Sequence, residues 1–535
     1  MIKITITQHL LMHNCIIASL KRVSVSILLL LSATAISMTA LPANLQAEAQ
    51  APLVKLTLSD SIISALKNNP LILSLEIAPA LAKQDKNFTK GRLDTIITTE
   101  ASVGRDKSPA TSSILGSTFE TRDRKASLTI EKTFLSGTTA ALKLEASRIE
   151  SNSRATTLNP AWQSRLFVEL RQPLLKGAWS GRPAEEIKVK DLVTRAEKYR
   201  YRDKLEKEIF KIVKSYWELK YAAIQKKIRK ENLLLARKLL GEARAMVKAG
   251  QKAQDDLNQT KAQLASRQDQ LQQAKNDYNI KLTNLQTLTG LAGDLLKSSV
   301  ILLTDTPQID SFNPAADQLL KTALRDRSDF VAAELRLKAE KLRVEIAENQ
   351  TLPELELRAQ AGLEGLAGVP RDTDFGTGIS SQFAGESGDS FDRLASGDFP
   401  NYTIGVTLSR SLENRKARSR LETARLKLRQ ASLNALSLKQ QIIAEVKNAL
   451  SGLNSARQRI KASKMAVKHM ELALNGATEK FKEGLLSTRD LLEFQSDLIE
   501  SRLGLKRALI DYEIATAETR YASGQLGKYF GIEFG

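Results

Sequence analysis

Residues 250–290 read GQKAQDDLNQTKAQLASRQDQLQQAKNDYNIKLTNLQTLTG, and residues 484–524 read GLLSTRDLLEFQSDLIESRLGLKRALIDYEIATAETRYASG. Both stretches begin and end with glycine. A shift of 234 positions (484 − 250) carries the first onto the second without a gap. Apolar residues at the seven-residue spacing of a coiled-coil helix mark the first stretch: Leu257, Leu264, Leu271, Tyr278 and Leu285.

The same shift also relates the residues that precede the two opening glycines. It carries four heptad-spaced positions onto apolar residues: Ile209 to Ile443, Ile212 to Val446, Tyr216 to Leu450 and Leu219 to Leu453. Each copy therefore has a long helix, a break at glycine and a returning helix. One offset that holds over about eighty residues indicates a duplicated helical hairpin.

The bulk composition fits long helices with narrow apolar faces. Of the 535 residues, 5% are aromatic and 26% are charged, which does not favour one large globular core. The net charge of +20 is the kind of value that often signals nucleic acid. Here the basic residues are spread along helices between glutamates, so no nucleic-acid partner is expected.

Cysteine and histidine usage argues against an enzyme. The only cysteine is Cys15, and two of the three histidines, His9 and His13, lie in the same leading segment. Without that segment the chain has no thiol and a single histidine, His469, on a heptad helix. Cysteine–histidine catalysis, cysteine-based zinc sites and disulfides are therefore excluded. We expect no catalytic residue, no metal and no cofactor.

The first 47 residues predict an export signal. They contain no acidic residue, and Lys21 and Arg22 precede an apolar run from Val23 to about Ala35. Small residues follow, with cleavage expected near Ala47. A membrane anchor is the alternative, but this run is too short to span a bilayer comfortably.

Between about Thr95 and Arg171 the hydrophobic period changes from 3.6 to 2, which predicts strands. Apolar residues alternate with polar or charged ones in three segments: Ala126, Leu128 and Ile130; Leu142, Leu144 and Ala146; and Leu166, Val168 and Leu170. Such strands suit a transmembrane barrel with a wet lumen. A half-buried soluble sheet gives the same alternation.

The second copy repeats this arrangement. Leu355, Leu357, Ala359, Ala361 and Leu363 alternate with charged or polar residues, and Tyr402, Ile404, Val406 and Leu408 form a returning strand. Residues 367–399 between them are rich in glycine, serine and aspartate, so we expect a long exposed loop there. The long helices exceed any bilayer: about 65 residues precede Gly250, or roughly 100 Å of helix.

The order of these segments resembles the TolC-like outer-membrane efflux protein family. The residues that carry the resemblance are Leu56-Thr57-Leu58 through Asn68-Asn69-Pro70, Gln172-Pro173-Leu174, Asn414-Arg415, and Phe481-Lys482-Glu483-Gly484 through Asp490-Leu491-Leu492. The shared spacing of Gly250 with Asp256 and of Gly484 with Asp490 matches the hairpin turns of that family. Similarity extends over nearly all of the chain after the export signal.

The resemblance implies a mainly α fold with a transmembrane β part. Long coiled-coil hairpins form an α-barrel, and the β-barrel closes only in a homotrimer. It implies the outer-membrane channel of a tripartite efflux or type I secretion system, with its helices in the periplasm. Expected partners are outer-membrane lipid, a periplasmic adaptor (membrane fusion) protein and an inner-membrane pump, proton-driven or ABC-type. The alternative is an exported coiled-coil scaffold with a soluble β-domain and no conduit.

The expected division of the chain follows the two copies. The first copy comprises the export signal (1–47), an N-terminal helix (48–92), barrel strands and loops (93–174) and a helical hairpin (175–292). The second comprises a linker and first helix (293–352), barrel strands with the exposed loop (353–411), a helical hairpin (412–525) and a C-terminal tail (526–535). An additional alternating pair at about 125–148 either enlarges the barrel to six strands per subunit or forms an extra hairpin outside the membrane.

The resemblance also implies a gate at the periplasmic mouth, formed by acidic residues just after the second hairpin turn. Asp490 and Glu493 match those positions and share a helix face, and Asp256 is the equivalent residue of the first copy. In a trimer, repulsion among the carboxylates and their attraction for cations would make the closed mouth cation-selective and pH-sensitive. The alternative is that these acids cap the helices that follow the turns.

The two turns are the expected adaptor-docking surface. Gly250 and Gly484 fit the positive φ or close approach that a tight turn requires. The flanking residues leave room for an adaptor helix: Ala249, Ala253, Leu485 and Ser487.

Overall fold

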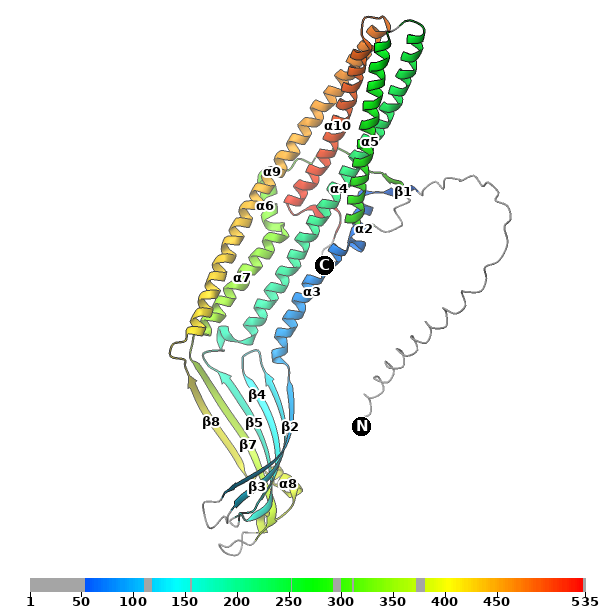
Figure 1. The fold of residues 1–535 in the computed structure, drawn as a ribbon. Helices are drawn as coiled ribbons and strands as arrows, with labels where there is room; N and C mark the ends of the chain where they lie inside the picture. Colours follow the sequence, from blue (N-terminus) through cyan, green and yellow to red (C-terminus); the bar gives the residue numbers. More distant parts are fainter. Residues whose placement is uncertain are drawn as a thin grey trace, which may run out of the picture. The chain divides into compact units, whose positions relative to one another are not determined.

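The computed structural model describes residues 53–109, 118–153, 156–251, 253–291, 300–309, 312–371 and 381–532. The expected export signal, with Cys15, His9 and His13, lies outside the described residues. Leu53–Gly535 is a compact unit of its own. Mainly helical with one large sheet, it confirms the predicted fold class (Figure 1).

The first copy contains α2 (Leu58–Asn68), α3 (Pro70–Lys90), four strands, and a helical hairpin of α4 (Pro183–Lys248) and α5 (Gln254–Thr289). The second contains α6 (Ala316–Asp326), α7 (Ser328–Asn349), two strands, and a hairpin of α9 (Arg415–Lys482) and α10 (Thr488–Ala522). In Figure 1 the hairpins lie side by side, with both tips at the end of the unit away from the sheet. The predicted duplication is confirmed.

Six antiparallel strands form one sheet in the order β2-β3-β4-β5-β7-β8. The strands are β2 (Ile96–Pro109), β3 (Thr118–Thr133), β4 (Thr139–Ser151), β5 (Leu158–Pro173), β7 (Glu354–Pro370) and β8 (Pro400–Ser409). The additional pair expected at about 125–148 is therefore β3 and β4, in the middle of this sheet rather than outside it. β2 and β8 are its two edges.

Within β3 the two faces of the sheet differ in exposure. In β3, Arg122, Arg124 and Leu128 lie on the same face as the other apolar residues of the strand, and all three are exposed. Their neighbours Asp123, Ser127 and Thr129 are only partly exposed. We call the face that carries the apolar rows the convex face and the opposite, charged face the concave face, after the curvature that a barrel segment with a polar lumen requires.

Part of the segment expected to be an exposed loop is ordered, so the expectation for 367–399 was wrong. β7 continues to Pro370, and Ser387–Ser396 form helix α8. Glu386 and Asp389 make a capping box at its start, and Leu394 is buried. Glutamate and aspartate here act as helix-capping residues, so a polar composition does not distinguish a loop from a short capped helix.

Three further elements were not predicted. β1 (Leu53–Leu56) and β6 (Val300–Leu303) pair in parallel, and α11 (Leu526–Tyr529) follows α10. Four-residue strands have too few positions to display a period. The pairing of β1 with β6 joins the start of one copy to the start of the other.

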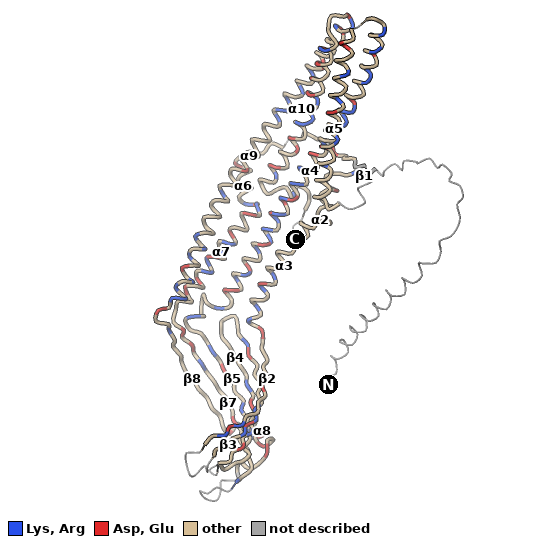
Figure 2. The backbone as a smooth tube through the Cα atoms, in the orientation of Figure 1, with Lys and Arg blue, Asp and Glu red and all other residues tan. Residues whose placement is uncertain are grey.

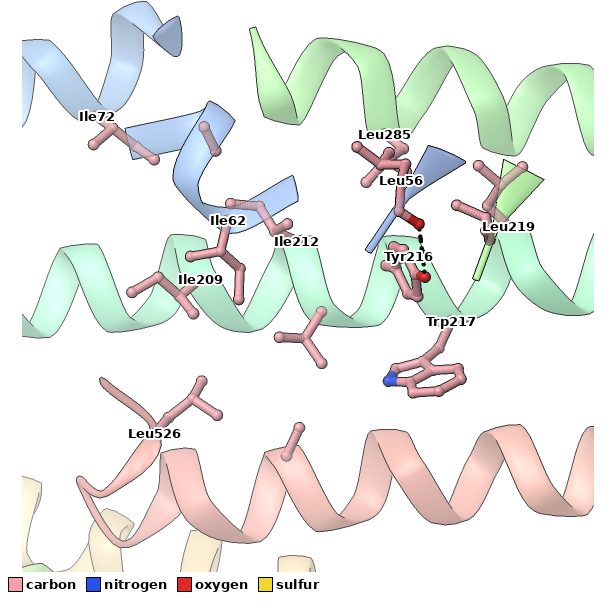
Figure 3. Close-up of a cluster of buried hydrophobic side chains, with 14 of the residues drawn as sticks. Leu56, Ile62, Ile72, Ile209, Ile212, Tyr216, Trp217, Leu219, Leu285 and Leu526 are labelled. Carbon is pink, nitrogen blue, oxygen red and sulfur yellow. Dashed lines mark hydrogen bonds between the residues drawn. The ribbon is translucent and has the colours of Figure 1, made fainter. Parts of the chain in front are cut away.

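The largest buried cluster lies halfway along α4. Ile209, Ile212, Tyr216 and Leu219 are at most 1% exposed and contact β1, α2 and the end of α5 (Figure 3). The Tyr216 hydroxyl is 2.7 Å from an Asp305 carboxylate oxygen and 3.2 Å from the Leu56 carbonyl oxygen. Burial and that carboxylate raise the pKa of Tyr216. This cluster fixes where the hairpins sit on the rest of the unit.

Candidate functional site

The turn between α4 and α5 is a Schellman motif, the common glycine-terminated helix end. Gly250 has φ +73° and donates its N–H to the Val247 carbonyl at 3.1 Å. The Gln251 N–H bonds the Met246 carbonyl at 2.9 Å. A residue with a Cβ is strained at this φ, so the turn favours glycine.

The turn between α9 and α10 repeats this geometry at the shifted position. Gly484 has φ +74° and donates to the Phe481 carbonyl at 3.1 Å, and the Leu485 N–H bonds the Lys480 carbonyl at 2.9 Å. The ends of the two hairpins, Gly290 and Gly524, also have positive φ. The 234-residue offset therefore applies to backbone conformation as well as to residue type.

Both turn glycines face open space, since a Cβ built on either would have no atom within 4 Å. The expected docking residues Ala249, Ala253, Leu485 and Ser487 are all exposed, and Leu485 is 77% exposed. A large aliphatic side chain this exposed at a helix-hairpin tip gains nothing from the fold of the single chain.

Asp490 takes part in a capping box at the start of α10. Its carboxylate accepts from the Ser487 hydroxyl at 2.7 Å, while the Asp490 N–H donates to that hydroxyl oxygen at 3.2 Å. The capping alternative therefore has a direct structural basis. Glu493 lies one turn further along and is exposed.

Asp256 lies in the first turn of α5 and is partly exposed. The local geometry at this helix start differs from that at Asp490. Ala253 stands where the second copy has Ser487, and no side chain caps α5. The two copies thus share the acid and the glycine but not the hydroxyl that engages the acid.

Contacts between the two hairpins include ion pairs that sequence reasoning missed. Arg507 of α10 contacts Glu218 of α4 at 2.9 and 3.2 Å, and Arg229 of α4 contacts Glu500 of α10 at 2.7 Å. Burial raises the pKa of Glu218, but the hydrogen bonds and charge of Arg507 outweigh it, so the net shift is downward. No motif marks these pairs, because their partners are nearly 300 residues apart.

A buried ionic cluster joins α7 to α9 and α4. The Arg327 side chain is 7% exposed; it contacts Asp329 at 2.6 Å and also pairs with Glu445 of α9. Burial lowers the pKa of Arg327, but the two carboxylates more than compensate. On the neighbouring face of α4, burial raises the pKa of Asp203 to about 6 and that of Glu206 to about 7.

Within the described ranges, no group of His, Cys, Asp and Glu side chains is arranged to hold a metal ion. Among the helices that the structure describes, none is long and apolar enough to cross a membrane.

The fold is one in which a strand segment carries two long helical hairpins. Solved channels share it at low sequence identity. The Campylobacter jejuni CmeC outer membrane channel matches 88% of this chain and 86% of its own, with TM-score 0.61 and 16% identity. The open-state Neisseria gonorrhoeae MtrE outer membrane channel matches 88% and 89%, with TM-score 0.59 and 15% identity.

Sequence comparison gives the family. Residues 319–525 match the family described as "Outer membrane efflux protein". Outer membrane efflux protein BepC of Brucella suis is 24% identical over 333 residues, which cover 62% of this chain and 66% of that relative. Together with the fold, these matches confirm the predicted resemblance to TolC-like outer-membrane efflux proteins.

Proposed function

We propose that three copies of this chain form a passive conduit that crosses the outer membrane as a β-barrel and continues into the periplasm as a helical tunnel. The observation that carries the proposal is the open six-stranded sheet, with an apolar convex face and with edges at β2 and β8 that no other described strand pairs. In lipid, an unpaired strand edge costs several kcal/mol for each unsatisfied backbone group. Pairing β2 of one copy with β8 of the next removes both edges.

The strand number supports a trimer rather than a closed monomer. A membrane barrel needs about eight strands or more, and one copy has six. Three copies would supply eighteen strands (3 × 6), enough for a water-filled lumen. The charged concave face would then line the lumen, with Glu145, Arg165 and Glu169 among its residues.

The helical hairpins support the periplasmic part. α4 has 66 residues and α9 has 68, so each is about 100 Å long at 1.5 Å per residue. This length suits a reach from the outer membrane towards a pump in the inner membrane. The partners would be a periplasmic adaptor at the hairpin turns and an inner-membrane pump, of the kinds used in tripartite efflux or type I secretion.

Fractionation and conductance test this function together. We expect the protein in the outer-membrane fraction, extractable only with detergent, with the mass of three chains. After reconstitution into a planar bilayer it should conduct ions steadily without nucleotide. A monomer with an ordered sheet in the soluble periplasmic fraction would instead support the scaffold alternative.

A further inference from the structure

The convex face of the sheet changes character along its length. Its apolar rows run from Leu355 to Leu363 in β7, paired across the sheet with residues such as Leu166 and Leu144. The eight residue-to-residue steps from Leu355 to Leu363 span about 27 Å along the strand. At a strand tilt of about 40° this is roughly 20 Å along the membrane normal. These rows thus fill most of the apolar band, about 25 Å tall, of a membrane barrel.

Beyond this band, on the side away from the helices, the convex face becomes basic. In the described parts of β2, β3 and β4 it carries five basic side chains and two acidic ones. The basic residues are Arg105, Lys107, Arg122, Arg124 and Arg148, hereafter the basic rim; the acidic ones are Glu120 and Glu150. Charged segments gather at this far end of the sheet in Figure 2.

The excess of positive charge lies on one face. At the same levels the concave face of these strands carries Asp106, Asp123 and Lys125, which is an acidic balance. A random spread of charge near loops would not separate the signs across the sheet. Because successive side chains of a strand point to opposite faces, the separation is built into the sequence alternation.

The basic rim stays accessible and only partly neutralised. Arg105 and Arg122 share the single carboxylate of Glu120, and their side chains are 58% and 59% exposed. Arg148 pairs with Glu150. For Arg124, which is exposed, the described residues provide no ion-pair partner.

Arg124 and Arg148 border a cavity that contains an aromatic ring. The cavity of about 360 Å³ lies between these arginines, Trp162 and Phe391 of α8. The Arg148 guanidinium lies 5.9 Å from the centre of the Trp162 ring. α8 closes one side because Gly365 lets it approach; a Cβ there would lie 1.9 Å from the Ser390 carbonyl oxygen.

The level of this cavity points to its occupant. Arg124, Arg148 and Trp162 are in register with Ala367, twelve residues beyond Leu355. That is about 40 Å along the strand and roughly 30 Å along the normal. If the apolar band lies in the hydrocarbon, as in the proposed function, this level is that of the outer-leaflet headgroups.

We propose that the basic rim and the adjoining cavity bind phosphorylated lipid headgroups of the outer leaflet. This inference rests on the proposed function. Guanidinium groups bind phosphate through paired, charge-assisted hydrogen bonds, and an amphipathic tryptophan suits the boundary between headgroup and acyl chain. Bound lipid would hold the barrel at a fixed depth and cover the seam between α8 and the sheet.

The test uses the full-length native protein in nanodiscs of phosphatidylcholine, with or without a phosphorylated glycolipid or its dephosphorylated form. We expect the phosphorylated glycolipid alone to bind in native mass spectrometry and to raise the unfolding temperature. Arg124→Gln with Arg148→Gln should weaken binding by about tenfold or more, as loss of two charge-assisted contacts implies. Inorganic phosphate should not substitute for the lipid.

The matched control is Lys143→Gln with Arg171→Gln, which removes the same charge from the concave face of β4 and β5, away from the cavity. It should bind glycolipid as the native protein does. Equal binding by both double variants, or equal binding of phosphorylated and dephosphorylated lipid, would overturn the inference. Conductance of the native protein is measured in parallel. A native protein that conducts ions but fails the lipid-binding test contradicts this inference alone, whereas a native protein that does not conduct contradicts the proposed function.

Discussion

Leu485, at the tip of the second hairpin, is a large aliphatic residue that the single chain leaves exposed. It is 77% exposed and its backbone, not its side chain, holds the turn. We predict that Leu485→Gln weakens transport and adaptor binding while leaving the unfolding temperature of the trimer unchanged, because only an intermolecular apolar contact is lost. Drug or substrate export in cells and adaptor pull-down would measure this.

Substitution of the turn glycine gives a second test of docking, with a glycine inside α9 as its control. Gly484→Val forces a β-branched residue to φ +74°, which costs about 1–2 kcal/mol, whereas Gly476→Val lies within α9 with no atom near its Cβ. Transport should fall for Gly484→Val and stay near normal for Gly476→Val. If Leu485→Gln and Gly484→Val both export substrate at the level of the native protein, docking at this turn is refuted.

Asp490 invites a test that separates its two roles. Asp490→Asn removes the charge, and Ser487→Ala breaks the capping box but keeps the carboxylate; loss of a cap typically costs about 1 kcal/mol. We predict that only Asp490→Asn lowers the cation selectivity of the channel in planar bilayers. An identical change in both variants, or in neither, would leave Asp490 a helix cap and nothing more.

The burial of Glu206 predicts a pH dependence of stability. Its pKa is raised to about 7, first by burial and then by Asp203. A carboxyl group with a raised folded-state pKa stabilises the fold when protonated. That contribution is complete below the unfolded pKa of about 4 and is lost as the pH rises through about 7. Stability should therefore decline between about pH 5 and about pH 8.

We predict that Glu206→Gln flattens this decline, raising the unfolding temperature more at about pH 8 than at about pH 5. Glu208→Gln is the control, since Glu208 is also buried but pairs with Lys211 at 2.7 Å. Thermal unfolding followed by circular dichroism at several pH values measures both. Parallel pH curves for the native protein and Glu206→Gln would show that Glu206 does not titrate in this window.

At the scale of elements, the sheet has two faces with opposite tolerance for charge. Leu142 lies near the middle of the apolar rows, opposite Val168, and Ala141 lies on the concave face opposite Glu131 and Glu169. Leu142→Arg should cost about 2–4 kcal/mol in the membrane, as arginine does at the lipid face near the midplane. Ala141→Arg should be tolerated because carboxylates surround it.

Folding into lipid vesicles, followed by the heat-induced gel shift of a closed barrel, measures both variants. Leu142→Arg should lower the folded yield and Ala141→Arg should not. Equal yields would mean that the convex face does not contact lipid.

The elements differ in how far sequence could reveal them. The long hairpins were predictable, because Leu257 to Leu285 display five heptad positions and the copy 234 residues on repeats them. Short elements were not: β1, β6 and α11 have four residues each, fewer than any period needs. α8 was missed because it lies in a segment rich in glycine, serine and aspartate, a composition that also forms loops.

The candidate site was predictable in part. The turn glycines follow from local conformational rules, which act within a few residues. The Arg507–Glu218 and Arg327–Glu445 pairs join residues far apart in the chain, so only the fold brings them together. The capping box at Ser487 and Asp490 carries its own signal, Ser-x-x-Asp, yet that signal cannot tell a cap from a gate.

The whole assembly depends on the two edges of the sheet. Among the strands that the structure describes, β2 is paired only with β3, and β8 only with β7. We expect β2 of each subunit to pair with β8 of the next, so that three subunits close one barrel. The chain's only cysteine is Cys15, in the expected export signal, so engineered cysteines can report this contact without background.

Disulfide crosslinking between β2 and β8 tests the central claim most directly. A cysteine at Ala101 would be combined in turn with one at Tyr402, Ile404 or Val406, to find the register in native outer membranes. The account predicts a ladder of bands that ends at three subunits, in at least one of the pairs. Crosslinks confined within single chains, or none at any register, would contradict a barrel shared by three copies.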